Sequence, residues 1–371
     1  MYLDSLQLVN FRNYDNLYLK FNKNVNLIIG KNGQGKTNIV EAIYMLSFGK
    51  SFRTSKDKEI IKFEKENLYA GGSFSKEYTK GMIEIGLSKN KKGIKVNKIP
   101  IQKIYELLGN INVVIFSPED LRLVKEGPKE RRSFIDKEIS QIVPKYYNYL
   151  TNYNKILFQR NQLLKKNSVD LDLLSVYDES LARYGSYIYV LRRDFIKKIG
   201  KISSEMHYKL TNKLENLVIS YKNQINLTED DTIELTYNKF LEKLASNRKN
   251  DIETRTTRYG IHKDDINIYV NDLDVRLYGS QGQQRTASIS LKLSEIELIN
   301  QEVGEYPILI LDDVFSELDE IRQKLLIENL SIVQMFITTA EDAHKNIFNR
   351  QQTTIFNINS GTVVSIENGG N

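Results

Sequence analysis

The sequence predicts an α/β protein whose main domain is divided between the two ends of the chain by an inserted helical hairpin. Two observations predict the divided domain: the apolar runs 25–29 and 308–311 have the character of buried β-strands, and each leads into glycine-rich or acidic residues. A third observation predicts the hairpin, because apolar and aromatic residues between 146 and 195 recur at heptad-like spacing.

Composition restricts the chemistry that the chain can perform. It has 371 residues, 53 Lys and Arg against 47 Asp and Glu, a formal net charge of +6 and no cysteine. Disulfides, thiol nucleophiles, iron–sulfur clusters and cysteine-based zinc sites are therefore excluded. The longest aliphatic runs fall far short of a membrane span, so we expect a cytoplasmic protein with no membrane partner. The small basic excess suits a polyanionic partner or an ordinary solvated surface equally well.

The N-terminal third contains a short apolar run at 25–29, which predicts a central buried strand, and the main domain is expected to include an antiparallel β subdomain. Apolar residues alternate with polar ones in two strands before that run, at Leu3, Leu6, Leu8, Leu17, Leu19 and Phe21. Residues 82–87 and 94–99 form a predicted hairpin whose tip, 90–93, is basic. Further strands are expected at 113–116 and 266–270.

The middle of the chain predicts a short helical arm. Its apolar and aromatic positions step by three and four, at Tyr146, Leu150, Tyr153, Leu157, Tyr177, Leu181, Tyr184, Ile188, Leu191 and Phe195. The polar stretch 165–172 interrupts them, which favours two antiparallel helices over one rod. We therefore expect three parts: 1–128, 129–250 as the helical arm, and 251–371.

A phosphate-binding loop is predicted between the strand 25–29 and the helix that follows it. The residues Gly30-Lys31-Asn32-Gly33-Gln34-Gly35-Lys36-Thr37 match the G-x-x-x-x-G-K-[ST] P-loop in full. Backbone N–H groups of such a loop surround the phosphates of ATP, Lys36 neutralises the β and γ phosphates, and the Thr37 hydroxyl binds Mg²⁺. A glycine-rich turn that binds nothing is the weaker interpretation of so complete a match.

The second acidic element of a P-loop ATPase is predicted at the end of the run 308–311. Asp312 would hold the hydrated Mg²⁺ from a strand beside the P-loop strand, and Asp313 would polarise the attacking water. Lys36 and Asp312 lie 276 positions apart in the sequence. This separation is larger than one compact nucleotide-binding domain normally has between these two motifs. The helical arm is the predicted insertion.

The segment Ser280-Gln281-Gly282-Gln283-Gln284-Arg285 resembles the signature motif of the ABC ATPase superfamily. That resemblance implies an ABC-type head in which Ser280, Gly282 and Gln283 contact the γ-phosphate of ATP held by a second copy, so that ATP joins a homodimer. Taken alone, the same residues would also form an ordinary helix N-cap. Residues 316–319 stand where the superfamily has its D-loop.

Over essentially its whole length the sequence resembles the RecF family of bacterial recombination-repair ATPases. The segments that carry this resemblance, besides the ATPase motifs, are 8–14, 49–54, 116–121, 127–132 and 260–265. The resemblance implies a weak, DNA-stimulated ATPase that dimerises with ATP on duplex or gapped DNA. It also implies cooperation with RecO and RecR in loading RecA at single-stranded gaps.

Three departures from the expected patterns affect the inferred chemistry. Asp313 stands where most ABC ATPases have Glu, which favours slow hydrolysis, and Thr338-Thr339 replace the switch histidine expected after the strand 332–337. Ile261 occupies a position where the RecF family often has Pro. For His207, His262 and His344 a structural or solvated role is favoured, because their spacing fits no metal site.

DNA contacts are predicted only as clusters of basic residues. The candidates are Lys89, Lys91 and Lys92 with Lys95 and Lys98 at the hairpin, Lys50 and Arg53 with Lys56 and Lys58 after the P-loop helix, and Arg192, Arg193, Lys197, Lys198 and Lys201 on the arm. Such groups would contact phosphates without sequence preference. An ordinary solvated surface remains open for each cluster, and Arg12 and Arg53 could serve the nucleotide instead.

Two functions other than DNA repair are also compatible with an ABC-type head. A transporter ATPase subunit is disfavoured, because such subunits have a compact signature domain and a shorter spacing between the P-loop and the acidic strand. A structural clamp of the SMC type carries arms of hundreds of residues, whereas the insertion here is about 120 residues long. A repair ATPase is therefore the favoured function.

Overall fold

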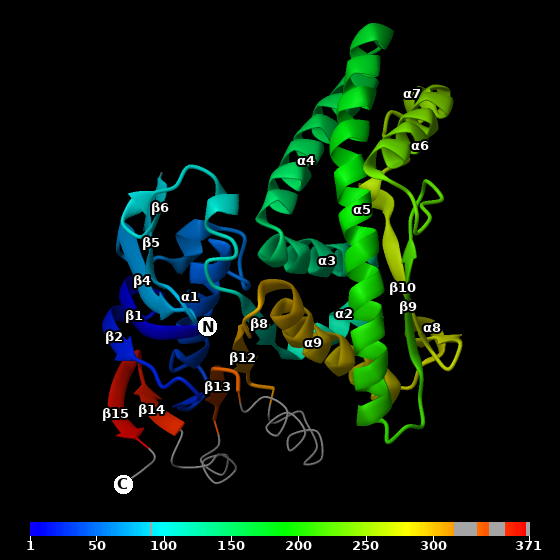
Figure 1. The fold of residues 1–371 in the computed structure, drawn as a ribbon. Helices are drawn as coiled ribbons and strands as arrows, with labels where there is room; N and C mark the ends of the chain where they lie inside the picture. The colour runs from blue at the N-terminus through cyan, green and yellow to red at the C-terminus, as the bar shows by residue number, and fades with distance from the viewer. Residues whose placement is uncertain (90, 315–331, 341–352, 369–371) are drawn as a thin grey trace. The chain divides into compact units, whose positions relative to one another are not determined.

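Figure 1 shows the computed structural model, which describes residues 1–89, 91–314, 332–340 and 353–368. The chain forms two compact units, the first from Met1–Asp120 and Ile299–Asn371 and the second from Leu121–Leu298. The predicted division of one domain between the chain ends is present. The segment 251–298, which the sequence pattern groups with the C-terminal part, packs within the second unit, because β10 (Asp265–Val270) pairs there with β9 (Leu217–Lys222).

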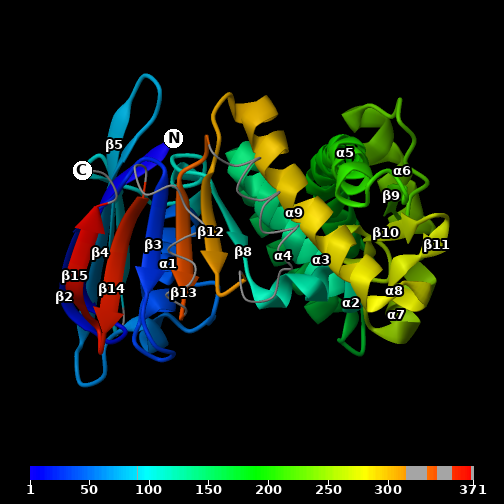
Figure 2. The same ribbon diagram turned by 90° about the horizontal axis from the view of Figure 1, so that it is seen from below.

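The first unit contains a largely parallel sheet of six strands in the order β15-β14-β3-β13-β12-β8, of which Figure 2 shows β14 to β8 side by side. Its strands are β3 (Val25–Ile29), β8 (Val113–Phe116), β12 (Ile308–Asp312), β13 (Met335–Thr339), β14 (Thr353–Asn359) and β15 (Thr362–Asn368). Every residue of β3, β8, β12 and β13 is buried. Such continuous apolar runs are typical of a parallel sheet covered on both faces.

An antiparallel sheet of the order β2-β1-β4-β5-β6-β7 completes the first unit and confirms the predicted β subdomain. Its strands are β1 (Tyr2–Phe11), β2 (Tyr14–Lys20), β4 (Asn67–Ser75), β5 (Lys80–Ser88), β6 (Lys92–Val96) and β7 (Ile99–Pro100). Helix α1 (Lys36–Phe48) contacts strands of both sheets. It is buried almost all round, which explains its nearly continuous apolar sequence.

The second unit contains the predicted helical hairpin. Its elements are α2 (Arg122–Lys125), α3 (Pro128–Ile142), α4 (Pro144–Leu164), α5 (Leu171–Leu210), α6 (Ile233–Ser246), α7 (Arg248–Thr254), α8 (Val275–Tyr278), most of α9 (Gln281–Val303), and the strands β9 (Leu217–Lys222), β10 (Asp265–Val270) and β11 (Leu273–Asp274). Helices α4 and α5 pack together, and α5 has 40 residues, or about 60 Å at 1.5 Å per residue.

The heptad-like positions form the core of the second unit. Tyr146, Tyr153, Leu181, Ile188 and Phe195 are all buried in one cluster, as the spacing predicts. In the described ranges, no helix has the length and hydropathy that crossing a bilayer requires.

Buried ion pairs lie within the apolar core of the second unit. Arg160 is fully buried, and its guanidinium donates to Asp178 at 2.7 Å and to Asp251 at 2.8 Å. Arg192 is paired in the same way with Asp136 at 2.8 Å and Asp264 at 3.2 Å. The assignment of Arg192 to a DNA-facing surface is therefore wrong, because only 1% of its side chain is exposed.

The Arg160→Ala variant should be strongly destabilised, because it leaves the Asp251 carboxylate buried without its cation. We expect a loss of about 3 kcal/mol in the free energy of unfolding, the lower end of the usual range, since Arg248 still pairs with Asp178 at 2.7 Å. Urea unfolding followed by circular dichroism measures it. Lys197→Ala, which removes a surface pair with Glu229, is the control and should leave the midpoint nearly unchanged. Equal midpoints for Arg160→Ala and the wild type would contradict the prediction.

Candidate nucleotide-binding site

The P-loop leaves β3 at Ile29 and enters α1 at Lys36, as the motif requires. Gly33 and Gly35 have φ of 80° and 112°, in the left-handed region that L side chains rarely adopt. Glycine is also needed for space, because a Cβ on Gly30 would lie 2.4 Å from the Ile358 carbonyl oxygen and one on Gly35 would lie 2.6 Å from Asn13 Nδ2.

Two turns from other parts of the first unit hold the loop in place. Asn13 Nδ2 and the Gly361 N–H both donate to the Gln34 carbonyl oxygen, at 3.0 and 2.9 Å. The Tyr14 hydroxyl donates to the Gly35 carbonyl at 3.1 Å. The loop is therefore supported by its own protein contacts, and Asn13 is a supporting residue that the P-loop motif by itself does not reveal.

Lys36 places its charge inside the loop. Its ammonium group donates to the carbonyl oxygens of Gly30 at 2.8 Å and Lys31 at 3.3 Å. The side chain is 4% exposed and lies at the N-terminus of α1, whose free N–H groups carry a partial positive charge. A cation and a helix N-terminus at one loop form an anion-binding site of the kind that polyphosphates occupy.

Asp312 meets the P-loop helix at the end of β12. Thr37 Oγ1 donates to Asp312 Oδ1 at 3.1 Å, and Thr338 Oγ1 donates to the same oxygen at 2.7 Å. Burial raises the pKa of Asp312 above its ordinary value, whereas the two hydroxyl bonds act in the opposite direction. A hydroxyl and a carboxylate oxygen side by side fit Mg²⁺, which takes one or two protein oxygens and completes its shell with water and phosphate.

The sheet order corrects one sequence-based expectation. The strand that carries Asp312 does not lie beside the P-loop strand, because β13 pairs in parallel with both and separates them. Thr338 lies on β13, between these two strands, and its hydroxyl donates to Asp312. The Asp313 N–H donates to Thr338 Oγ1 at 3.0 Å, and Asp313 has a φ of 53°. The sequence pattern singles out Thr338 only because it replaces the expected switch histidine. In the structure its hydroxyl contacts both Asp312 and Asp313.

Arg12 and Arg53 converge on a buried carboxylate of the P-loop helix. Arg12 donates two bonds to Glu41, from Nε at 2.9 Å and from Nη2 at 2.6 Å. Arg53 Nη1 lies 3.5 Å from Glu41 and donates to Asn38 Oδ1 at 2.9 Å. Glu41 is fully buried and has no counterpart among the predicted site residues. The predicted contacts of Arg12 with ATP and of Arg53 with DNA stay predictions.

The signature segment lies in the second unit, at the start of α9. Ser280 Oγ accepts from the Gln283 N–H at 3.2 Å, and Gln283 Oε1 accepts from the Ser280 N–H at 2.9 Å. This reciprocal pair is a capping box. Ser280 and Gly282 are exposed. Their contact with ATP stays a prediction, and residues 316–319 and His344 lie outside the described residues.

Comparison with known proteins decides the family. Residues 2–362 match the family model described as the RecF/RecN/SMC N terminal domain. The chain is 73% identical over all 371 residues, and over 100% of both chains, to the DNA replication and repair protein RecF of Clostridioides difficile strain 630. The chain belongs to the RecF family.

Other RecF proteins and their structures agree over the full length. Identity is 49% to RecF of Alkaliphilus oremlandii strain OhILAs, over 98% of this chain and 100% of the relative. A solved structure of the recombination mediator protein RecF with ATPrS, in the RecFOR pathway, superimposes with a TM-score of 0.92 at 40% identity, covering 98% of this chain and 97% of the other. An Smc head domain from Pyrococcus furiosus, at 16% identity and a TM-score of 0.55, shares the fold, which is of the ABC and SMC type.

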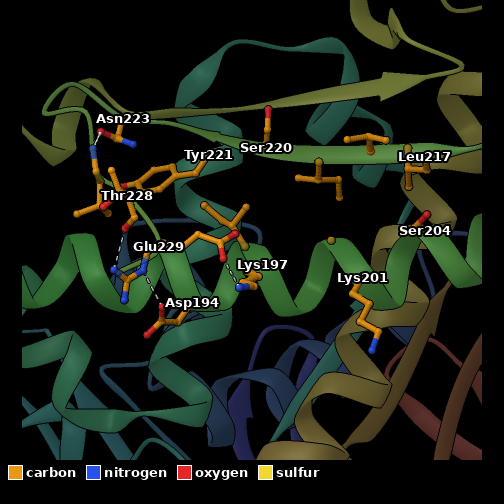
Figure 3. A pocket seen from close by; sticks show the side chains of 16 residues that line it. Asp194, Lys197, Lys201, Ser204, Leu217, Ser220, Tyr221, Asn223, Thr228 and Glu229 are labelled. Carbon is orange, nitrogen blue, oxygen red and sulfur yellow. Dashed lines mark hydrogen bonds and ion pairs between the residues drawn. The ribbon is translucent and has the colours of Figure 1, made fainter. Parts of the chain in front are cut away.

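The candidate DNA-binding lysines of this RecF-family chain differ in their surroundings. Lys50, Lys89 and Lys91 are exposed, and Lys92 is half-buried. Lys89 pairs with Glu66 at 3.0 Å and Lys92 with Asp57 at 2.9 Å. On the arm, Lys197 and Lys201 line a groove of about 530 Å³ between α5 and β9, where Lys197 pairs with Glu229 (Figure 3). Lys91 is therefore an exposed candidate at the hairpin tip, and DNA contact stays a prediction for all of these lysines.

Two of the three histidines are hydrogen-bonded within the second unit, one of them buried and the other half-buried. His207 is fully buried, and His262 Nδ1 lies 3.0 Å from the Tyr153 hydroxyl. Burial lowers the pKa of His262 to about 4. No cluster of three or more His, Asp or Glu side chains that could hold a metal is found among the described residues. Both imidazoles make hydrogen bonds within this unit, and their structural role stays a prediction.

The Thr338→Val variant should need more Mg²⁺ to bind ATP than the wild type does. The hydroxyl of Thr338 lowers the pKa of Asp312, so its loss raises that pKa and moves the Mg²⁺ requirement to higher concentration and higher pH. We expect the Mg²⁺ midpoint of ATP binding to rise about tenfold. Thr338→Ser keeps the hydroxyl and should behave as the wild type. An unchanged midpoint in Thr338→Val would contradict the role of this residue.

Proposed function

We propose that this chain is an ATP-dependent DNA-binding protein of recombinational repair. In this proposal it is a weak, DNA-stimulated ATPase of the cytoplasm that dimerises with ATP at gapped DNA and at junctions of duplex and single strands. It then helps RecO and RecR to load RecA. The supporting observation is that Lys36 donates to the P-loop backbone and Thr37 donates to Asp312, in a chain that is similar to RecF proteins over its whole length.

The head would bind ATP through the loop and the two acidic residues. Lys36 and the α1 N-terminus hold the β and γ phosphates, and Thr37 and Asp312 hold Mg²⁺, which neutralises phosphate charge. Asp313 orients the attacking water. Its side chain is one methylene shorter than the Glu of most ABC ATPases, so the water is held less well and hydrolysis is slow. ATP therefore serves mainly as a switch.

The second copy would complete each ATP site. Ser280 and Gly282 are exposed at the N-terminus of α9, where N–H groups and a hydroxyl can contact a γ-phosphate. A site assembled from two copies makes dimerisation depend on ATP, and hydrolysis then releases the dimer. DNA would be bound by basic side chains of both copies, without sequence preference.

Binding measurements with three nucleotide states test this proposal directly. The affinity for duplex, single-stranded and gapped DNA is measured with ATP, with ADP and without nucleotide, while light scattering follows dimerisation. We expect the highest affinity with ATP, on substrates that contain duplex, in parallel with dimer formation. Equal affinity in all three states would overturn the proposal.

The Ser280→Arg variant should lose the ATP-dependent dimer, because a bulky cation blocks the contact of α9 with the partner's γ-phosphate. Binding of ATP by the monomer should stay within about twofold of the wild type, since the P-loop lies in the first unit. Size-exclusion chromatography with light scattering measures the dimer. Ser246→Arg, at an exposed serine that ends α6, is the control. A persistent dimer in Ser280→Arg would remove the signature segment from the interface.

The Lys91→Glu variant should bind duplex DNA more weakly in the presence of ATP. If Lys91 contacts one phosphate, its loss reduces the slope of log affinity against log salt by about one. Fluorescence anisotropy at several salt concentrations measures this slope. Lys20→Glu, an exposed lysine at the end of β2 in the same sheet, is the matched control. A slope equal to that of the wild type would assign Lys91 to ordinary solvated surface.

A further inference from the structure

A chain of hydrogen bonds supports the start of α9 from the end of α5. His207, in the last turn of α5, has Nδ1 at 3.0 Å from Ser290 Oγ and Nε2 at 3.2 Å from Glu215 Oε2. The other carboxylate oxygen of Glu215 accepts from Gln283 Nε2 at 2.9 Å. We call Ser290, His207, Glu215 and Gln283 the α9 brace, because Ser290 and Gln283 both belong to α9.

The brace fixes the amide group of Gln283. Its nitrogen faces a carboxylate, which can only accept, and its oxygen faces the Ser280 N–H, which can only donate. In this orientation the amide oxygen of Gln283 accepts from the Ser280 N–H. The backbone N–H of Gln283 donates to Ser280 Oγ in the same capping box. Glu215 therefore acts on the Ser280 hydroxyl through one intermediate residue.

Glu215 is itself held from two sides. Its N–H donates to Thr211 Oγ1 at 3.2 Å, and Thr211 Oγ1 donates to the His207 carbonyl at 2.8 Å, so the loop is attached to the end of α5. The imidazole of His207 is fully buried and cannot turn away to solvent. Burial lowers the pKa of His207 below its ordinary value, and the Glu215 carboxylate acts in the opposite direction. The carboxylate is thus placed by rigid elements and not by a surface loop alone.

We propose that Glu215 is a positioning residue for the signature segment, which through Gln283 holds Ser280 in the orientation that meets the γ-phosphate of ATP bound by a second copy. The proposal rests on the role proposed above for Ser280. It also makes the end of the long arm helix part of the ATP-dependent interface, because His207 joins Glu215 to α5. Any displacement of this end of α5 would reach the signature segment through two hydrogen bonds.

An exchange of the two interacting groups tests the proposal. Gln283→Glu places two carboxylates opposite each other, and we expect the dimer formed with ATPγS and Mg²⁺ to weaken about tenfold. Glu215→Gln combined with Gln283→Glu restores an amide opposite a carboxylate and keeps the same residue at position 283, so we expect it to recover most of the tenfold loss. Glu205→Gln, at an exposed glutamate of the same turn of α5, is the control. Light scattering over a range of protein concentrations measures the dimer.

Binding of ATP by the monomer and the far-ultraviolet circular dichroism spectrum distinguish positioning from a general loss of folding, because in Gln283→Glu both should stay as in the wild type while the dimer weakens. A double variant as weak as Gln283→Glu would overturn the proposal, since residue 283 would then act on the phosphate by its own charge. A single variant as strong as the wild type would overturn it as well. If the wild type forms no dimer with ATPγS, the proposed function fails and this inference fails with it.

Discussion

Strand β13 pairs in parallel with both β3 and β12, and this pairing joins the two ends of the chain. The P-loop follows β3 and Asp312 ends β12, so the nucleotide site exists only when the three strands are in register. The register Asp312 to Thr338 sets the hydroxyl of Thr338 against the carboxylate, while Thr37 approaches from α1. A slip of one residue would turn each of these side chains to the other face of the sheet.

The two units use different means to place their functional residues. In the first, the P-loop is held by the side-chain amide of Asn13 and the Gly361 N–H, which both donate to the Gln34 carbonyl. In the second, buried ion pairs of Arg160 and Arg192 join helices and loops that are far apart in sequence. Such pairs cost desolvation free energy, and they tolerate few alternative arrangements. They hold α5 at Asp178 and Arg192, whereas the α9 brace extends from its last turn at His207.

Local patterns predicted much of this architecture. The P-loop, the buried strands 25–29, 113–116 and 308–311, and the helical hairpin are each encoded within a few consecutive residues, by glycine spacing or by apolar periods of two and of three to four. The structure confirms each of these elements. Whole-chain similarity also identified the RecF family, because motifs and spacing are properties of sequence alone.

Contacts between distant positions could not be read from those patterns. The sequence placed Asp312 one strand too close to the P-loop and marked Thr338 only as a missing histidine, because periodicity gives the faces of a strand but not its neighbours. It assigned Arg192 to a basic surface, because charge shows neither burial nor partners. The sequence by itself thus determined which elements form and which phosphate chemistry they carry. Only the tertiary structure decided which polar groups meet, since hydrogen bonds such as those of Glu41 with Arg12 and of Glu215 with Gln283 arise from packing across long separations.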